Sequence, residues 1–208
     1  RRVSGDPDPD NKSLYRGLLA YRLSDAQLFF GRSQAIAGLR SRLRFPLTTL
    51  HAESGAGKTS LLQAGIAPRL LAAGHLPVYL RPYTADPALK IKHAFIAELD
   101  QTPKLAAASL RGFLKQVCSV LGPETILFIV LYQFEEFFTL LDEPTRARFV
   151  GELADCLDDE TLNARWMLAL RADSFSKLST FRPAIANPFG NDFALNRQHA
   201  NGSLDGNR

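Results

Sequence analysis

The sequence predicts a three-layer α/β/α fold built around a mainly parallel sheet, and three observations support this prediction. The chain has 208 residues, of which 46% are hydrophobic and 22% charged, as in an ordinary globular α/β domain. Short runs of strand-forming residues alternate with amphipathic helical patterns, which is typical of parallel sheets with helical crossovers. The run at 125–132 is apolar without interruption, as in a central strand that is covered on both faces.

The expected elements follow one another from the N-terminus. Residues 24–30 are typical of a capped helical turn, and Ser33 is expected to cap a helix over 34–44, which Pro46 ends. Residues 47–50 form the first expected strand, and Ser60 opens the helix that follows the next loop. The other expected elements are strands at 78–81, 125–132, 165–170 and 192–195, and helices at 86–99, 104–120, 133–141 and 145–157.

Between the first strand and its helix lies the motif Ala-Glu-Ser-Gly-Ala-Gly-Lys-Thr at 52–59. Its spacing is that of a phosphate-binding loop, with Ala52 in place of the usual first glycine. Gly55 and Gly57 let the backbone turn so that successive N–H groups converge on phosphate oxygens. Lys58 adds positive charge toward the β- and γ-phosphates, and the Thr59 hydroxyl is placed to ligate Mg²⁺. The residues expected to contact a nucleotide here are Ala52, Glu53, Ser54, Gly55, Ala56, Gly57, Lys58, Thr59 and Ser60.

The composition argues against several other classes of protein. The net charge of +4 is spread along the chain, so nucleic acid is not the expected partner. The longest apolar run, 126–132, is too short to cross a membrane. Cys118 and Cys156 make no disulfide framework and are expected to be buried free thiols. A cytoplasmic protein is therefore expected.

Polar segments flank the predicted domain. Residues 1–13 are rich in Asp, Pro, Asn and Ser and are expected to form a linker or disordered arm, and the Gly- and Asn-rich tail at 198–208 is also expected to be disordered. The phosphate-loop core is therefore expected to occupy residues 14–197. Because the first residue is Arg rather than Met, the chain is expected to be a piece of a longer protein.

Short motifs along the chain point to one family when they are taken together. They are Phe-Phe-Gly-Arg at 29–32, Gly-Ala-Gly-Lys-Thr-Ser at 55–60, Gln-Phe-Glu-Glu-Phe-Phe at 133–138 and Leu-Arg-Ala-Asp-Ser-Phe at 170–175. In this order they resemble the nucleotide-binding domain of the novel STAND NTPases, a bacterial branch of the signal-transduction ATPases. The resemblance covers roughly residues 14–196, which is nearly the whole chain.

The resemblance implies roles for residues outside the phosphate loop. Phe30, Gly31 and Arg32 match the segment that packs near the adenine and the ribose. Arg171 matches the residue that senses the γ-phosphate, and either Glu135 or Glu136 would polarise the attacking water.

Simpler interpretations of these side chains stay open. The two glutamates are also suited to a solvated helix start, where acids favour the helix dipole. Arg171 could pair with Asp173 or Glu136 as a structural charge, and Asp173 is expected to cap a helix rather than to act as a ligand.

Two positions depart from the family pattern. Tyr132 stands at the end of the apolar strand, where the family has the aspartate that orders the Mg²⁺ shell. A tyrosine supplies a neutral phenol and no carboxylate, so hydrolysis is expected to be slow. Ser33 stands where an acidic residue commonly follows the arginine.

The expected function is that of an ATP-binding switch in a signalling or defence protein, with ATP or ADP and Mg²⁺ as ligands. The resemblance implies an effector domain and a sensor domain, often a WD-repeat propeller, in the full-length protein, and a possible nucleotide-dependent homo-oligomer. The lid and winged-helix segments expected after the core are not in this sequence. The alternatives are a degenerate remnant, which Tyr132 favours, and a small-molecule kinase; a GTPase is disfavoured because no Asn-Lys-x-Asp motif follows the loop.

Overall fold

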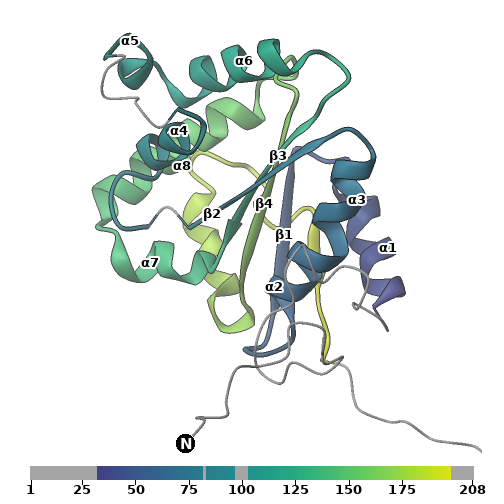
Figure 1. Ribbon diagram of the computed structural model, residues 1–208. Coiled ribbons are helices and arrows are strands. Elements are labelled where there is room, and N and C mark those ends of the chain that lie inside the picture. The colour runs from purple at the N-terminus through teal and green to yellow at the C-terminus, as the bar shows by residue number, and fades with distance from the viewer. Residues whose placement is uncertain (1–31, 82, 97–102, 198–208) are drawn as a thin grey trace, which may run out of the picture.

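The computed structural model describes residues 32–81, 83–96 and 103–197, and these form one parallel sheet with helices on both faces (Figure 1). The sheet has five strands in the order β2-β3-β4-β1-β5. The strands are β1 (Leu47–Ala52), β2 (Leu76–Leu80), β3 (Leu127–Tyr132), β4 (Ala164–Arg171) and β5 (Asp192–Ala194). All neighbouring strands pair in parallel, which confirms the predicted α/β class and places each expected strand within about two residues of its predicted limits.

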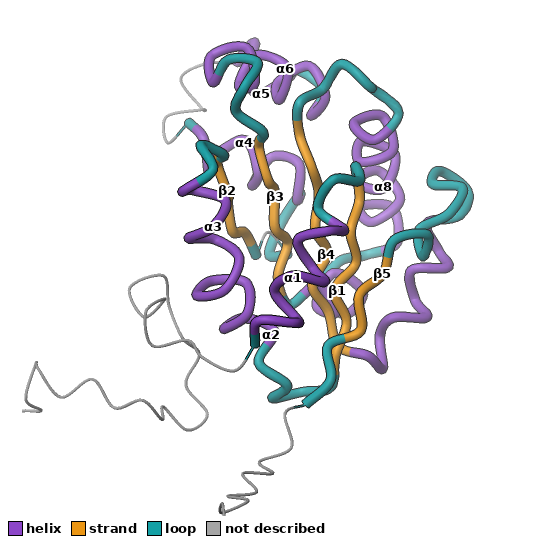
Figure 2. The backbone as a smooth tube through the Cα atoms, turned by 90° about the vertical axis from the view of Figure 1, so that its right-hand side faces the viewer, coloured by secondary structure: helices purple, strands orange, loops and turns teal. Residues whose placement is uncertain are grey.

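Two apolar layers hold the helices against the sheet. One face carries α1 (Ser33–Arg42) and a continuous helical segment made of α2 (Lys58–Ser60), η2 (Leu61–Ile66) and α3 (Ala67–Ala72). The other face carries α4 (Pro87–Phe95), α5 (Pro103–Ala107), α6 (Leu110–Leu121), η4 (Phe134–Glu136), α7 (Phe137–Leu140), α8 (Glu143–Leu157) and η5 (Ala172–Phe181). Figures 1 and 2 show these helical layers on opposite sides of the strands, which is the predicted three-layer arrangement.

The strand β3 shows how the alternation of side chains serves both layers. Leu127, Ile129 and Leu131 are fully buried in the layer beneath α4, α6 and α8. Phe128 and Val130 are buried in the layer beneath α1 and the phosphate-loop helix. Burial on both faces explains why the sequence of this strand is apolar without alternation.

The N-cap residue predicted from the sequence is confirmed for α4 and is wrong for α1. Asp86 caps α4, because its carboxylate accepts hydrogen bonds from the backbone N–H groups of Ala88 and Leu89. The prediction that Ser33 caps the first helix is wrong, since Arg32 is the N-cap residue and Ser33 is the first helical residue. The expected turn at 24–30, the arm at 1–13 and the tail at 198–208 lie outside the described residues. The prediction that the helix starting at 86 continues to 99 is wrong, since α4 ends at Phe95 and Ile96 is extended.

The helix predicted over 104–120 is in fact two helices, α5 and α6. Ser109 breaks the pattern by capping α6, with its hydroxyl oxygen accepting from the N–H of Gly112 at 3.1 Å. The buried Lys92 of α4 donates from Nζ to the carbonyl oxygens of Ala106 (2.9 Å) and Ala108 at the end of α5. A buried ammonium needs such acceptors, so the break satisfies Lys92 with carbonyls that a continuous helix would use internally.

Among the described residues, no helix combines the length and the apolar character that a membrane span requires.

Candidate functional site

The carboxyl ends of the parallel strands bring distant segments of the chain to one edge of the sheet. The loop after β1 lies there with the segments that follow β3, β4 and β5 (Figure 1). Because β4 lies between β1 and β3, Arg171 at its end stands between the 53–57 loop and the glutamates that follow β3. This edge is where open α/β sheets bind their ligands.

The loop after β1 has the backbone that its glycines allow. Gly55 has a φ of 75° and Gly57 a φ of 87°, both in the left-handed region that disfavours other residues. The N–H of Ala56 donates to the carbonyl oxygen of Glu53 at 3.3 Å, which closes the turn. The helix α2 starts immediately after Gly57, so the loop leads directly into a helix N-terminus.

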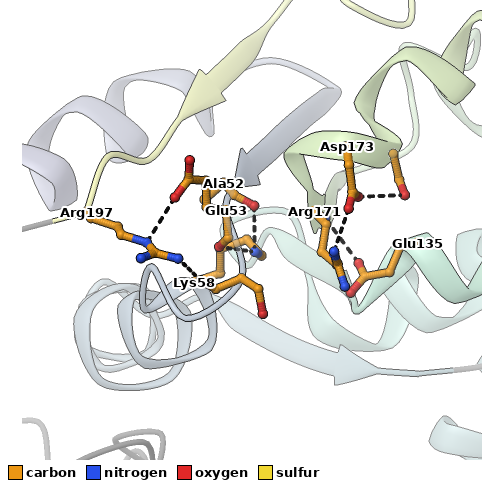
Figure 3. Close-up of polar contacts among 9 residues, drawn as sticks. Ala52, Glu53, Lys58, Glu135, Arg171, Asp173 and Arg197 are labelled. Atoms are coloured by element: carbon orange, nitrogen blue, oxygen red, sulfur yellow. Dashed lines mark hydrogen bonds and ion pairs between the residues drawn. The ribbon is translucent and has the colours of Figure 1, made fainter.

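Lys58 folds back onto the loop that precedes it. Its Nζ donates to the carbonyl oxygens of Ala52 at 3.0 Å and Glu53 at 3.2 Å (Figure 3). Burial lowers the pKa of Lys58, and the charge of Glu135 acts against this shift by raising the pKa. Arg171 further lowers the pKa of Lys58. The ammonium is therefore held inside the loop and within the electrostatic reach of the groups after β3 and β4.

Two arginines hold the outer side of the loop. Arg32 donates from Nη2 to the carbonyl oxygen of Ala56 at 2.9 Å and from Nη1 to that of Asn196 at 2.8 Å. Arg197 donates from Nη2 to the carbonyl oxygen of Ser54 at 2.9 Å, and its Nε lies 3.0 Å from Oε2 of Glu53 (Figure 3). A cavity of about 550 Å³ opens beside these contacts, between the start of α1 and the end of β5.

The two glutamates after β3 have different partners. Glu135 accepts a hydrogen bond on Oε2 from the backbone N–H of Arg171 at 3.2 Å (Figure 3). Glu136 makes a bidentate ion pair with Arg81, whose Nε and Nη2 lie 2.6 Å and 2.5 Å from its carboxylate oxygens. Arg81 follows β2, so this pair ties the end of an edge strand to η4. Glu135 is thus the carboxylate that faces the Lys58 side of the site.

Arg171 has a partner on its own segment. Its Nη2 lies 2.5 Å from Oδ2 of Asp173, and Oδ1 of Asp173 accepts from the Ser174 hydroxyl at 3.1 Å. The guanidinium holds the pKa of Asp173 below its usual range. The prediction that Asp173 caps a helix is wrong, because Arg171 is the N-cap residue of η5 and no side chain caps that helix.

Comparison with known families shows which family the chain belongs to. A family model described as Novel STAND NTPase 1 matches residues 15–199. The chain belongs to this family. The phosphate-loop motif, the Gln-Phe-Glu-Glu segment after β3 and Arg171 all lie inside the matched region, so the chain is a nucleotide-binding NTPase module.

Solved structures share the fold at low sequence identity. A Walker-type ATPase of Pyrococcus abyssi matches with a TM-score of 0.55 and 16% identity, over 85% of this chain and 55% of that one. The ORC2 protein of Aeropyrum pernix, in its ADPNP–ADP complexes, matches with a TM-score of 0.59 and 13% identity, over 80% of this chain and 48% of that one. The STAND chain therefore spans about half the length of these structures. No curated protein sequence matches the chain.

Tyr132 of the STAND chain packs on the phosphate-loop side of the sheet. Its side chain is half-buried against the layer that also contains Val130 and Leu61. Its carbonyl oxygen accepts a hydrogen bond from the Tyr83 hydroxyl at 3.1 Å, and burial raises the pKa of that hydroxyl. The backbone at this position is therefore fixed, while the side chain supplies an aromatic ring and no carboxylate.

Several contacts of the STAND site were not predicted from the sequence. Arg197 and Arg81 carry no motif, and their partners lie far away along the chain. His51 lies in β1 as expected of a strand-end residue, and its Nε2 is also 3.0 Å from Oδ2 of Asp192. Phe30 and Gly31, expected near the base, lie outside the described residues.

Proposed function

We propose that this chain is the ATP-binding switch module of a STAND-type signalling or defence protein. The observation that carries the proposal is the loop at 53–57, with left-handed backbone at Gly55 and Gly57 and with Lys58 curled onto its carbonyls. The family match supports a nucleotide at this loop. The choice of ATP, the switching role and a bacterial, cytoplasmic setting belong to the proposal.

We propose that the phosphate loop and the start of α2 bind the phosphates of the nucleotide. The N–H groups of the loop and of the first turn of α2 would donate to phosphate oxygens, with that of Ala56 first leaving the Glu53 carbonyl, and Lys58 would exchange the carbonyls of Ala52 and Glu53 for the β- and γ-phosphates. The Thr59 hydroxyl is the group that would hold Mg²⁺, and its place in the first turn of α2 fits that role. Bound Mg²⁺ would neutralise phosphate charge.

The base and the ribose would lie beside Arg32. The cavity between α1 and β5 is lined by Arg32 and Phe193 and adjoins the loop through the contact of Arg32 with Ala56. A mixed wall of cationic and apolar side chains suits an adenosine group. This assignment supports a preference for ATP over GTP, since the sequence has no guanine-reading motif.

Hydrolysis is proposed to be slow because Tyr132 supplies no carboxylate at the end of β3. Tyr132 cannot contribute to the metal shell, and Glu136 is held by Arg81. Glu135 remains as the group that orients the attacking water. Losing one preorganised polar group typically costs about two to three decades in rate.

Release of Arg171 from Asp173 would couple the presence of the γ-phosphate to the conformation of the segment after β4. Its pair with Asp173 is exposed on both sides, and such pairs contribute little stability, so the guanidinium can turn to a γ-phosphate. Loss of the γ-phosphate would return Arg171 to Asp173 and move the start of η5.

In the full-length protein we propose that flanking effector and sensor domains respond to this movement, with a WD-repeat propeller as a candidate sensor. We also propose that the ATP-bound form self-associates. The core is proposed to end at residue 197.

Tyr132 also favours a second candidate function, a degenerate domain that folds and binds nucleotide without cycling. The two candidates differ in whether ATP and ADP produce different states.

Competition binding tests the base preference of the site. With labelled ATP·Mg²⁺ bound to the 208-residue chain, unlabelled ATP should displace the label at concentrations at least ten-fold lower than GTP. Equal displacement by GTP would contradict the adenine assignment. An identical protease-digestion pattern with ATP and with ADP would favour the degenerate domain over the switch.

A further inference from the structure

Glu53 places a carboxylate on the phosphate loop itself. It follows Ala52 directly, and 69% of its side chain is exposed. A negative charge within a Debye length of bound phosphates repels them, so an unpaired Glu53 would weaken the function proposed for this loop.

Arg197 contacts this carboxylate from the segment that follows β5. A single guanidinium makes the 3.0 Å ion pair with Glu53 and the 2.9 Å hydrogen bond to the Ser54 carbonyl (Figure 3). Its planar fork of donors suits this double contact better than a lysine ammonium would. The sheet places Arg197 here, because β5 pairs with β1 and the N–H of Leu195 continues the ladder to the carbonyl of His51 at 2.9 Å.

The second contact has its own consequence. A carbonyl oxygen turned toward a bound phosphate would repel it, whereas a hydrogen bond from a guanidinium on the outer side of the loop favours the outward orientation. Arg197 holds the Ser54 carbonyl in this way, and Arg32 holds that of Ala56. The two arginines therefore support the orientation in which the N–H groups of the loop are available to phosphate.

We propose that Arg197 is a positioning residue for phosphate binding, which neutralises Glu53 and fixes the Ser54 carbonyl on the outer side of the loop. The proposal rests on the nucleotide-binding function proposed above and adds to it a residue from beyond β5. It assigns Arg197 no contact with the nucleotide.

A double-mutant cycle on the whole chain separates the neutralisation of Glu53 from the other effects of Arg197. ADP·Mg²⁺ affinity is measured for the wild type, Arg197→Ala, Arg197→Gln, Glu53→Gln and the double variant Arg197→Ala/Glu53→Gln. Arg40→Ala is the matched control, because Arg40 is exposed near the end of α1 that leads into β1, at the opposite edge of the sheet. Circular dichroism and thermal unfolding verify that each variant folds.

Both Arg197 variants should bind ADP about five-fold more weakly, and the deficit should shrink in 1 M salt. Glu53→Gln should bind more tightly than wild type because the loop loses a negative charge. The double variant should recover only part of the loss, because the Ser54 carbonyl is still released in it. Wild-type affinity in the Arg197 variants would overturn the proposal, as would an equal loss in the double variant, because Glu53 would then have no part in the effect of Arg197. Absence of binding by the wild type would instead refute the proposed function, and this proposal with it.

Discussion

Replacement of Tyr132 by aspartate should restore hydrolysis, and replacement by asparagine should not. Both changes remove a half-buried ring from the layer beneath the phosphate-loop helix. Full burial of a large apolar side chain contributes about 1.5–3 kcal/mol, so each variant should lose about 1 kcal/mol of stability from this cause. Because that loss is common to both, their difference isolates the carboxylate.

The carboxylate should act on the rate rather than on affinity. One preorganised polar group is worth about two to three decades in rate, or about 2.7–4 kcal/mol. Phosphate affinity depends mainly on the loop N–H groups and Lys58, which the substitution leaves in place. Tyr132→Asp should therefore raise single-turnover ATP cleavage by about 100-fold or more over both Tyr132→Asn and wild type, with ATP affinities of all three within about three-fold.

Phosphate release at saturating Mg²⁺ provides the rate, and thermal unfolding with and without Mg²⁺ provides an independent measure. Aspartate at position 132 lies near Glu135 in the sequence, so Mg²⁺ with ATP should stabilise the aspartate variant more than the asparagine variant. Equal rates for the two variants would refute the reasoning. A wild-type turnover of about one per second or faster would also refute it, since Tyr132 would then not limit the rate of hydrolysis.

The other predictions concern the charged groups after β2, β3 and β4. Glu135→Gln should lower the rate of ATP cleavage by about 100-fold. Glu136→Gln should leave that rate within about three-fold and lower the unfolding free energy by no more than about 1 kcal/mol, because Glu136 pairs with the exposed Arg81. Single-turnover rates and urea unfolding measure these effects, and a larger rate loss in Glu136→Gln than in Glu135→Gln would show that Glu136 orients the water. Arg171→Ala should reduce the preference for ATP over ADP by about ten-fold, since its guanidinium is proposed to leave Asp173 for the γ-phosphate; paired titrations measure this, and an unchanged preference would assign Arg171 a structural role.

The strands were predictable because their patterns are local. The apolar run ending at Tyr132 and the phosphate-loop motif can each be recognised within a few consecutive residues, although β3 and β1 pair with strands that are distant in the sequence. The alternation of strands and helices then leaves few parallel arrangements, since crossovers are right-handed.

The errors came from partners that are distant in sequence or otherwise not visible in it. The helix predicted over 104–120 is divided at Ser109, where the carbonyl oxygens before the break accept hydrogen bonds from the buried Lys92 of α4. The local sequence pattern does not show this contact with an earlier helix. Asp173 is the exception, because its pairing with Arg171 was one of the open interpretations of the sequence, and this pairing replaces the expected helix cap. Arg197 reaches the phosphate loop because β5 pairs with β1. A local sequence motif does not show which strands pair, so this contact could not be predicted.

Titration of ATP·Mg²⁺ into the wild type and Lys58→Ala tests the central claim most directly. Lys58 is the cation that the loop holds against its own carbonyls, and in a nucleotide complex it would meet the phosphates. The control is Lys90→Ala, which removes an equal charge from an exposed position on α4. Lys58→Ala should bind at least about ten-fold more weakly than wild type, a loss of about 1.4 kcal/mol or more, and Lys90→Ala should bind as wild type does. Superimposable titration curves for wild type and Lys58→Ala would contradict the assignment of this loop as the nucleotide site.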